Sequence, residues 1–297
     1  MSSLREVKDR IASVRSTLKI TSAMKFVASS KLRKAQRSIE ALRPYEESLR
    51  SILAAVLSAV QEPSDAVPAS PANGYAVPDE GDIPWDKKKS TVVLAFASNS
   101  SMCGAFNANV IKKTLAVLAG IEGPVELWAF GKKVAEGLRK AGVTASRDFM
   151  QLIAHPDFEK VAEVASSLRE LRDDGGVGDV ILVYNRFIST GRQEVVAELW
   201  GASAPSGEAE TPEDTLFILE PSRESLLESL KPQVEALQLY AALLDSVASE
   251  HAARMVAMQA ATDNGETLLA ELTLEYNKGR QQKITSEILD LVSGAGN

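Results

Sequence analysis

Residues 4–60 read LREVKDRIASVRSTLKITSAMKFVASSKLRKAQRSIEALRPYEESLRSILAAVLSAV. In a heptad register that starts at Leu4, both core positions are apolar in every repeat except at Thr21, Lys25 and Glu46. An apolar stripe of this period keeps one face of a helix against a partner helix along its whole length. The stretch therefore predicts one long helix that pairs in a coiled coil.

The other end of the chain has a similar pattern. Ser222 is a suitable N-cap for a helix that begins just after it, and beyond Pro232 only Gly265 and Gly279 interrupt the helical spacing. Pro232 is expected either to kink this helix or to open the next one. At about 1.5 Å per residue, a continuous helix over 233–293 would span roughly 90 Å. Long helices at both termini predict antiparallel pairing, with the middle of the chain as a separate domain.

The middle of the chain carries strand and helix patterns in alternation. Apolar runs predict strands at residues 92–98, 125–131, 179–187 and 216–220. Helical spacing is found over residues 107–119, 132–141 and 158–172. Strands that alternate with helices predict a mainly parallel sheet, so the fold class is α/β, with a Rossmann-like central domain attached to a long antiparallel coiled coil.

These patterns predict four segments in the chain. They are an N-terminal coiled-coil helix over 1–61, a flexible Pro-, Ala- and Ser-rich linker over 62–89, a central α/β domain over 90–221 and a C-terminal coiled-coil helix over 222–297.

Charge is distributed unevenly along the chain. Residues 1–50 contain twelve Lys and Arg against five Asp and Glu, a balance of +7, while the whole chain carries −7, so residues 51–297 carry −14. A basic helix suits an acidic partner surface, and it also suits the solvated flank of a coiled coil. A cleavable targeting peptide would be basic too, but Glu6, Asp9 and the unbroken heptad phase from Leu4 onward argue against it.

The basic arm leaves a nucleic-acid-binding coiled coil as the alternative function. Proteins that bind single strands stack bases on aromatic side chains. Residues 1–50 offer only Phe26 and Tyr45, which disfavours this alternative.

The residues needed for catalysis, cofactor binding or metal binding are not found in the sequence. Cys103 is the single cysteine, and the two histidines, His155 and His251, lie far apart. The turn at 98–107 lacks the G-x-G-x-x-G pattern of dinucleotide enzymes, and the Lys pair after Gly131 lacks the rest of a phosphate-binding loop. No apolar run approaches the roughly 20 residues of a membrane span. We therefore expect no catalytic, cofactor-binding or metal-binding site in this chain.

Three segments carry a resemblance to a known family. ARMVAMQAATDNG at 253–265, LEYNKGRQQKITSEILDLVSGA at 274–295 and ITSAMKFVASSKLRKA at 20–35 closely resemble the hallmark motifs of the gamma subunit of F-type ATP synthases. SNSSMCGAFN at 98–107 resembles that family more loosely, because Asn99 and Ser101 stand where the family commonly has Asp and Gly.

The resemblance implies a function without catalysis by this chain. In this family the terminal helices rotate inside a ring of alternating alpha and beta subunits, while the α/β domain binds the epsilon subunit and the c-ring. The implied role is the central rotary shaft that couples proton flow through the c-ring to ATP synthesis or hydrolysis. The implied location is the cytoplasmic side of a bacterial inner membrane, as a peripheral protein without direct membrane insertion.

The motifs also imply contact residues. Met24 and Lys25 are expected to face the moving lobe of the beta subunit, and Arg254, Gln281 and Thr285 to meet loops of the ring. With Cys103 alone, the cysteine pair that gives the chloroplast type its redox control is absent.

Overall fold

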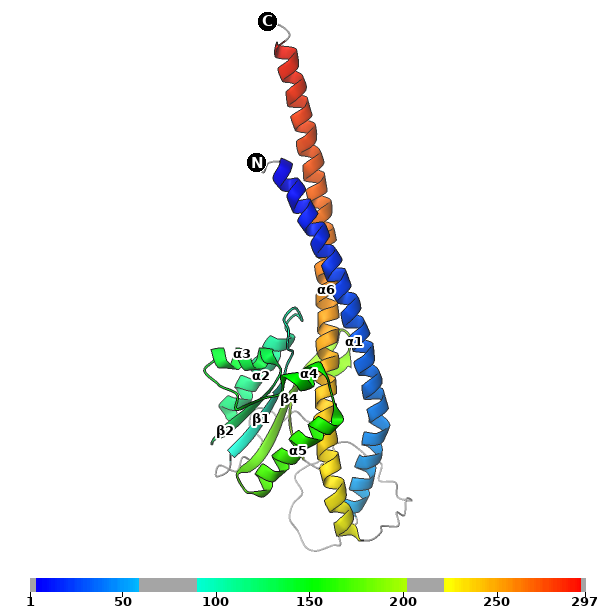
Figure 1. Ribbon diagram of the computed structural model, residues 1–297, viewed down its shortest axis with the longest axis vertical. Helices are drawn as coiled ribbons and strands as arrows, with labels where there is room; N and C mark the ends of the chain where they lie inside the picture. Colours follow the sequence, from blue (N-terminus) through cyan, green and yellow to red (C-terminus); the bar gives the residue numbers. More distant parts are fainter. Residues whose placement is uncertain (1–3, 59–89, 202–221, 295–297) are drawn as a thin grey trace. The chain divides into compact units, whose positions relative to one another are not determined.

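The computed structural model describes residues 4–58, 90–201 and 222–294, and the chain divides into two compact units. The coiled-coil unit comprises residues 1–30 and 254–297, and the sheet unit comprises residues 31–253. Two long helices, α1 (Leu4–Ser58) and α6 (Arg223–Gly294), contribute to both units (Figure 1). The predicted linker 62–89 and the predicted strand 216–220 lie outside the described residues.

Within the coiled-coil unit, α1 and α6 pair in antiparallel directions, as the heptads predict. The hydroxyl of Thr262 donates to that of Thr21 at 3.0 Å, and Lys25 Nζ donates to Gln259 Oε1 at 2.9 Å. Residue numbers therefore increase along α1 in the direction in which they decrease along α6. The heptad core position Ala28 is almost fully buried.

The two glycines that interrupt the C-terminal pattern are points of close helix approach. A Cβ on Gly265 would lie 2.7 Å from Leu18 Cδ2, and a Cβ on Gly279 would lie 3.1 Å from Leu4 Cδ2. Leu4 is the first residue of α1, whereas α6 continues from Gly279 to Gly294, which is roughly 22 Å at 1.5 Å per residue. This last part of α6 therefore extends past the start of α1.

In its described residues, the sheet unit contains a five-stranded sheet in the order β3-β2-β1-β4-β5. Its strands are β1 (Ser90–Phe96), β2 (Val125–Phe130), β3 (Arg147–Asp148), β4 (Val177–Ser189) and β5 (Arg192–Leu199). Pairings among the first four are parallel, and β5 is antiparallel to β4. The predicted mainly parallel sheet is confirmed, and β5 adds an antiparallel edge.

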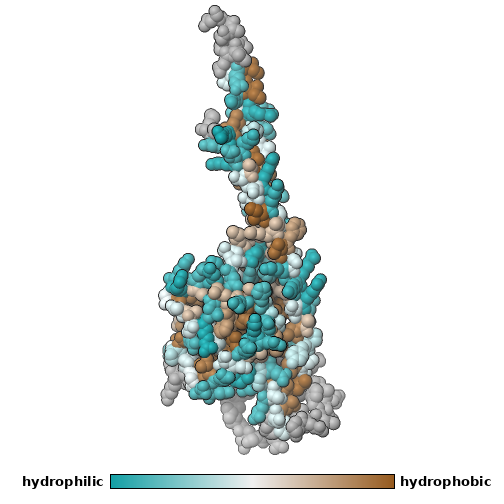
Figure 2. Space-filling view, viewed as in Figure 1, coloured by the Kyte–Doolittle hydropathy of each residue, from teal (hydrophilic) through white to brown (hydrophobic). Residues whose placement is uncertain are grey.

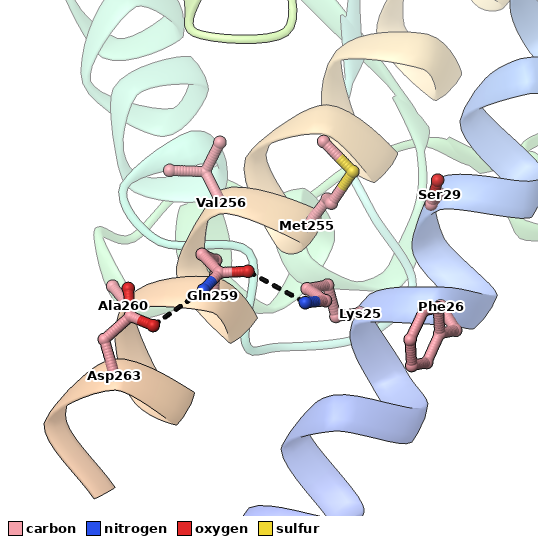
Figure 3. A pocket seen from close by; sticks show the side chains of 8 residues that line it. All are labelled: Lys25, Phe26, Ser29, Met255, Val256, Gln259, Ala260 and Asp263. Atoms are coloured by element: carbon pink, nitrogen blue, oxygen red, sulfur yellow. Dashed lines mark hydrogen bonds between the residues drawn. The ribbon is translucent and has the colours of Figure 1, made fainter. Parts of the chain in front are cut away.

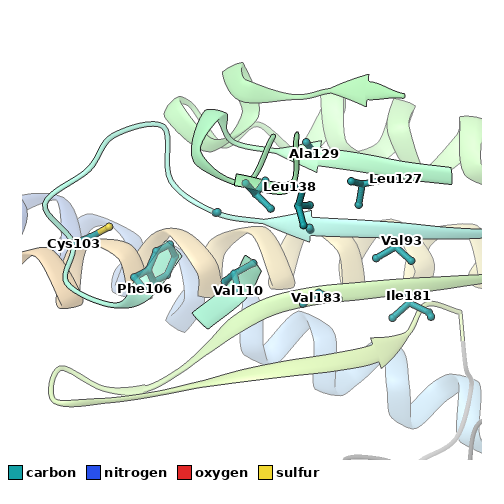
Figure 4. Packing of buried hydrophobic residues seen from close by; sticks show 12 residues of the cluster. Val93, Cys103, Phe106, Val110, Leu127, Ala129, Leu138, Ile181 and Val183 are labelled. Carbon is teal, nitrogen blue, oxygen red and sulfur yellow. The ribbon is translucent and has the colours of Figure 1, made fainter. Parts of the chain in front are cut away.

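Four shorter helices accompany the sheet: α2 (Phe106–Gly120), α3 (Lys132–Lys140), α4 (Met150–Ala154) and α5 (Phe158–Asp173). One buried cluster joins α2 and α3 to the inner face of the strands (Figure 4). It includes Phe106, Val110 and Leu138 from the helices, against Val93 and Ile181 from the strands. Continuous apolar strands covered in this way are what a buried parallel sheet requires.

At its lower-numbered end, α6 begins as predicted. The backbone N–H of Ser225 donates to Ser222 Oγ at 3.3 Å, which is the expected side-chain cap of a helix N-terminus. Pro232 lies inside the helix and does not end it, and Pro44 lies inside α1 in the same way. The helix then packs against α1, where Leu230 and Leu237 share a buried cluster with Leu49.

Candidate functional site

On α1, the coiled-coil unit presents an apolar ridge to solvent. Ile20, Met24 and Val27 follow one another at spacings of four and three residues, which places them on one helix face. Their exposed fractions are 52%, 38% and 56%. None occupies a core position of the heptad, so the apolar character of this face is not explained by the pairing with α6. Exposed apolar clusters of this kind are typical of protein-binding surfaces.

On another face of α1, which carries Lys25, Phe26 and Ser29, an open groove of about 490 Å³ lies between the two helices. Its polar side is a chain of contacts in which Lys25 Nζ donates to Gln259 Oε1 at 2.9 Å and Gln259 Nε2 donates to Asp263 Oδ1 at 2.7 Å (Figure 3). Its apolar side includes Phe26, which is 68% exposed, and Val256. The groove thus combines apolar surface with the charged groups of Lys25 and Asp263, both hydrogen-bonded to the amide of Gln259. This combination suits docking of a protein segment.

The far end of α6 carries a second exposed stripe. Leu274, Gln281 and Ile288 follow one another at intervals of seven residues, so they share one helix face. Leu274 is 70% exposed and Ile288 is 54% exposed, and Gln281 is exposed between them. Thr285 Oγ1 donates to the carbonyl of Gln281 at 2.9 Å, so its hydroxyl is directed to the helix backbone.

The five predicted contact residues therefore form two groups, all in the coiled-coil unit. Lys25 lines the groove, whereas Met24 lies on the exposed ridge. Gln259, which Lys25 contacts, is five residues along α6 from the half-buried Arg254. Gln281 is roughly 40 Å further along α6 than Arg254, at 1.5 Å per residue. The exposed apolar neighbours of these residues were not predicted as contact residues, although their positions outside the heptad core would have revealed them.

The N-terminus of α3, at the carboxyl edge of the sheet, is engaged by the chain itself. Ligands of such sheets bind beyond the carboxyl ends of the strands and at helix N-termini. Here the backbone N–H of Lys132, at the start of α3, donates to Asn99 Oδ1 at 3.0 Å, and Asn99 Nδ2 donates to the carbonyl of Met150 at 2.8 Å. The N–H of Lys133 donates to the carbonyl of Ser98 at 3.0 Å. The first two N–H groups of α3 are thus already engaged by other parts of the chain.

At the same edge, α6 covers the end of β1. Ser246 Oγ donates to the carbonyl of Phe96 at 3.4 Å, and Ser249 Oγ donates to the carbonyl of Asn185 at 3.1 Å. Gly131 passes so close to β1 that a Cβ there would lie 2.1 Å from the carbonyl oxygen of Ala97. Residues of α6 and Gly131 thus pack closely against the carboxyl end of β1.

Within the described ranges, no cluster of three or more His, Cys, Asp or Glu is placed to hold a metal ion. Over the same residues, no helix has both the length and the apolarity that a membrane crossing needs. Cys103 is buried, and its sulfur lies 3.1 Å from Asn107 Nδ2 and 3.7 Å from Ser98 Oγ, so it is a packed thiol at the end of the core.

Comparisons with known proteins agree with this geometry. A family model described as ATP synthase matches residues 3–296. The ATP synthase gamma chain of Phocaeicola vulgatus is 42% identical over 99% of both chains, and that of Flavobacterium johnsoniae is 38% identical over 99% of this chain and 98% of its own.

Solved structures share the fold. A chain of the mitochondrial ATP synthase of Euglena gracilis, in a structure of its OSCP, F1 and c-ring parts, aligns with a TM-score of 0.61 at 18% identity, over 98% of this chain and 92% of its own. A chain from the central stalk and c-ring structure of the Tetrahymena thermophila mitochondrial ATP synthase aligns with a TM-score of 0.54 at 21% identity, over 82% and 99%. With a family match over nearly the whole chain and relatives at about 40% identity, the chain belongs to the ATP synthase gamma chain family.

Proposed function

We propose that this chain is the central rotary shaft of an F-type ATP synthase and couples proton flow through a c-ring to ATP synthesis or hydrolysis in a ring of alpha and beta subunits. The observation that carries the proposal is the exposed apolar surface on both helices of the coiled-coil unit, together with the stretch of α6 beyond Gly279 (Figure 2). A shaft enclosed by a ring would have these surfaces covered in the complex. Family membership supports the same role.

In this role the chain is not itself an enzyme. It acts as a ligand whose orientation favours different conformations in neighbouring beta subunits, so its contacts must differ between those conformations. The two exposed stripes lie on single faces of α1 and α6, so they are not symmetric around the coiled coil. A surface without symmetry is what allows one shaft to place three identical subunits in different states.

The contact residues follow from the same proposal. Met24, on the ridge, and Lys25, at the groove, face the moving lobe of a beta subunit. Arg254, Gln281 and Thr285 meet loops of the ring at two levels of α6. The apolar ridge on α1 supplies the buried area around the first group, and the polar side chains supply orientation.

The remaining partners and the location belong to the proposal as well. The α/β domain, with the segment boundaries given above, binds the epsilon subunit and the c-ring. The chain is then peripheral on the cytoplasmic side of the inner membrane. The nucleic-acid-binding alternative receives no support from the comparisons, because the relatives are named ATP synthase gamma chains.

The experiment is co-expression of this chain with the alpha and beta subunits of the same organism, followed by purification through a tag on beta. The wild-type chain is expected to co-purify with a ring that hydrolyses ATP. Gln281→Ala and Arg254→Ala should leave assembly intact and lower steady-state ATPase severalfold, because a side-chain hydrogen bond contributes roughly 0.5–1.5 kcal/mol. Gln282→Ala is the matched control, since Gln282 is also exposed but lies on another face of α6.

Each outcome has a defined meaning. Loss of assembly in the variants would make these residues structural, and unchanged turnover would remove them from the contact surface. If the wild-type chain does not co-purify with the ring, the shaft proposal itself fails.

A further inference from the structure

In the sheet unit, a buried carboxylate joins α6 to α5. The side chain of Glu235 on α6 is only 2% exposed. Arg169 Nε lies 3.1 Å from its Oε2, and Arg172 Nη2 lies 2.6 Å from its Oε1. The two arginines are three residues apart on α5, which places them on one helix face. Each carboxylate oxygen is therefore held by a different guanidinium.

Further polar contacts surround this ion triad. Arg169 Nη2 also donates to the carbonyl of Pro232 at 3.3 Å, and Trp200 Nε1 donates to the carbonyl of Glu235 at 2.8 Å. The guanidinium of Arg172 lies 5.2 Å from the centre of the Trp200 ring, within the range of a cation–π contact. One short stretch of α6 is thus tied both to α5 and to the residue that follows β5.

Gln238 adds a second connection one turn further along α6. Its Nε2 donates to the carbonyl of Leu199, the last residue of β5, at 3.1 Å, and its Oε1 accepts from the N–H of Gly201 at 2.9 Å. Gly201 has φ +73°, and a Cβ there would lie 2.9 Å from Arg172 Nη1 and 3.0 Å from Glu235 Oε1. Position 201 therefore has no room for a side chain without disturbing the ion triad.

Stability alone does not explain these charges. A buried ion triad is often no more stabilising than apolar residues of the same volume, because removing charges from water is costly. Apolar packing, however, is non-directional, whereas hydrogen-bonded ion pairs fix the angle and position of both partners. Directional bonds resist sliding and rotation of α6 against the α/β domain, which is the load that a rotating shaft places on this junction.

We propose that Glu235, Arg169 and Arg172 form a torque clamp that keeps α6 and the α/β domain in fixed register while the chain turns. The proposal rests on the shaft function and assigns positioning residues for it. Rotation driven by ATP would pass along α6 and through the clamp to the α/β domain, and rotation driven by protons would pass in the opposite direction.

The test uses assembled ATP synthase in inverted membrane vesicles, with ATP hydrolysis and ATP-driven proton uptake measured on the same preparation. Glu235→Gln removes the charge that both guanidiniums hold. It should keep assembly and ATPase within about twofold of wild type, while proton uptake per ATP hydrolysed falls threefold or more. Arg169→Lys keeps the charge but loses the planar fork of the guanidinium, and should fall between wild type and Glu235→Gln. Glu228→Gln, an exposed acid on the same helix, is the control and should match wild type.

Two results would overturn the clamp. One is a ratio of proton uptake to ATP hydrolysed in Glu235→Gln that equals the wild-type ratio. If Glu235→Gln does not assemble, the same result in Arg169→Lys counts instead. The other is a loss of assembly, ATPase and proton uptake in step in both variants, which would make the triad a folding element only. In either case the wild-type complex still assembles and pumps, so failure of the clamp is distinguishable from failure of the shaft proposal.

Discussion

Replacing Asp245 by Asn should stabilise the sheet unit at neutral and alkaline pH. Asp245 lies on α6 and lines a cavity of about 380 Å³ together with residues of α1, β4 and β5. Burial raises the pKa of its carboxyl from 3.8 to about 7, opposed by the charges of Arg186 and Arg43 and assisted by that of Glu46. Glu198, on the other side of the cavity, is already held by Tyr184 and Arg186.

The sign of the effect follows from proton binding. Below pH 3.8 the carboxyl is protonated in both the folded and the unfolded protein. As the pH rises from there to about 7, the unfolded chain loses a proton that the folded protein keeps, so the free energy of unfolding falls and then levels off. At about 1.36 kcal/mol per pKa unit, the loss is at most about 4 kcal/mol. Asn cannot ionise, so Asp245→Asn removes this loss.

The assay is urea unfolding of the full chain at low protein concentration between pH 4 and pH 8.5, followed by the fluorescence of the buried residues Trp128 and Trp200. The stability difference between Asp245→Asn and wild type should be small at pH 4, widen up to pH 7 and stay constant above it. Asp179→Asn, at a half-buried carboxyl of β4 outside the cavity, is the control. Parallel pH curves for wild type and Asp245→Asn would refute the reasoning.

Three other predictions concern packing and exposure. Gly279→Ala should raise the free energy of unfolding of the paired helices by up to about 1 kcal/mol, because alanine has a higher helix propensity than glycine. Gly265→Ala has a closer contact and should lower that free energy by about 1 kcal/mol or more through overpacking. Circular dichroism melts of both variants would check the difference, and equal melts would count against the close approach at Gly265. Cys103→Ala should leave coupled ATP synthesis within about twofold, equivalent to roughly 0.4 kcal/mol, and a tenfold loss would reveal a functional thiol. The isolated chain should aggregate because Ile284 and Ile288 are exposed, and replacing both by Ser should raise its solubility in light scattering; a monodisperse wild-type monomer at high concentration would contradict this.

Periodicity made the helical part of the fold predictable. The seven-residue repeat in α1 is formed by positions close together in the sequence. The paired face of the helix can therefore be identified without knowing which helix it pairs with. β1, β2 and β4 were predictable for a similar reason, since strands buried on both faces are continuous apolar runs.

The sequence patterns did not predict β3, β5 or α4, because these elements form through contacts with other parts of the chain. β5 contains Glu194 and Glu198 among its valines, and only one of its eight residues is buried, as suits an edge strand. β3 has two exposed residues and α4 has five residues, so neither is long enough to carry a periodic pattern. Their positions are set by pairing and packing with residues far away in the sequence.

The residues of the sites also differ in whether a local sequence pattern can indicate them. The five expected contact residues of the coiled-coil unit were proposed from sequence motifs. In the structure Met24, Gln281 and Thr285 are exposed, and Lys25 and Arg254 are half-buried. Glu235 and Asp245, in contrast, look like ordinary polar residues on a helix. Their burial arises only when other elements close over α6, so no local pattern could indicate either the ion triad or the cavity.

The central claim, that this chain turns inside a ring of alpha and beta subunits, is tested most directly by observing rotation. Cys103 is 1% exposed, so a cysteine introduced as Lys140→Cys at the exposed end of α3 can carry an optical probe, with the ring fixed to a surface through its beta subunits. We expect continuous rotation of the probe in one direction when ATP is added, and none when hydrolysis is blocked. A probe that stays still while the same complexes hydrolyse ATP would contradict it.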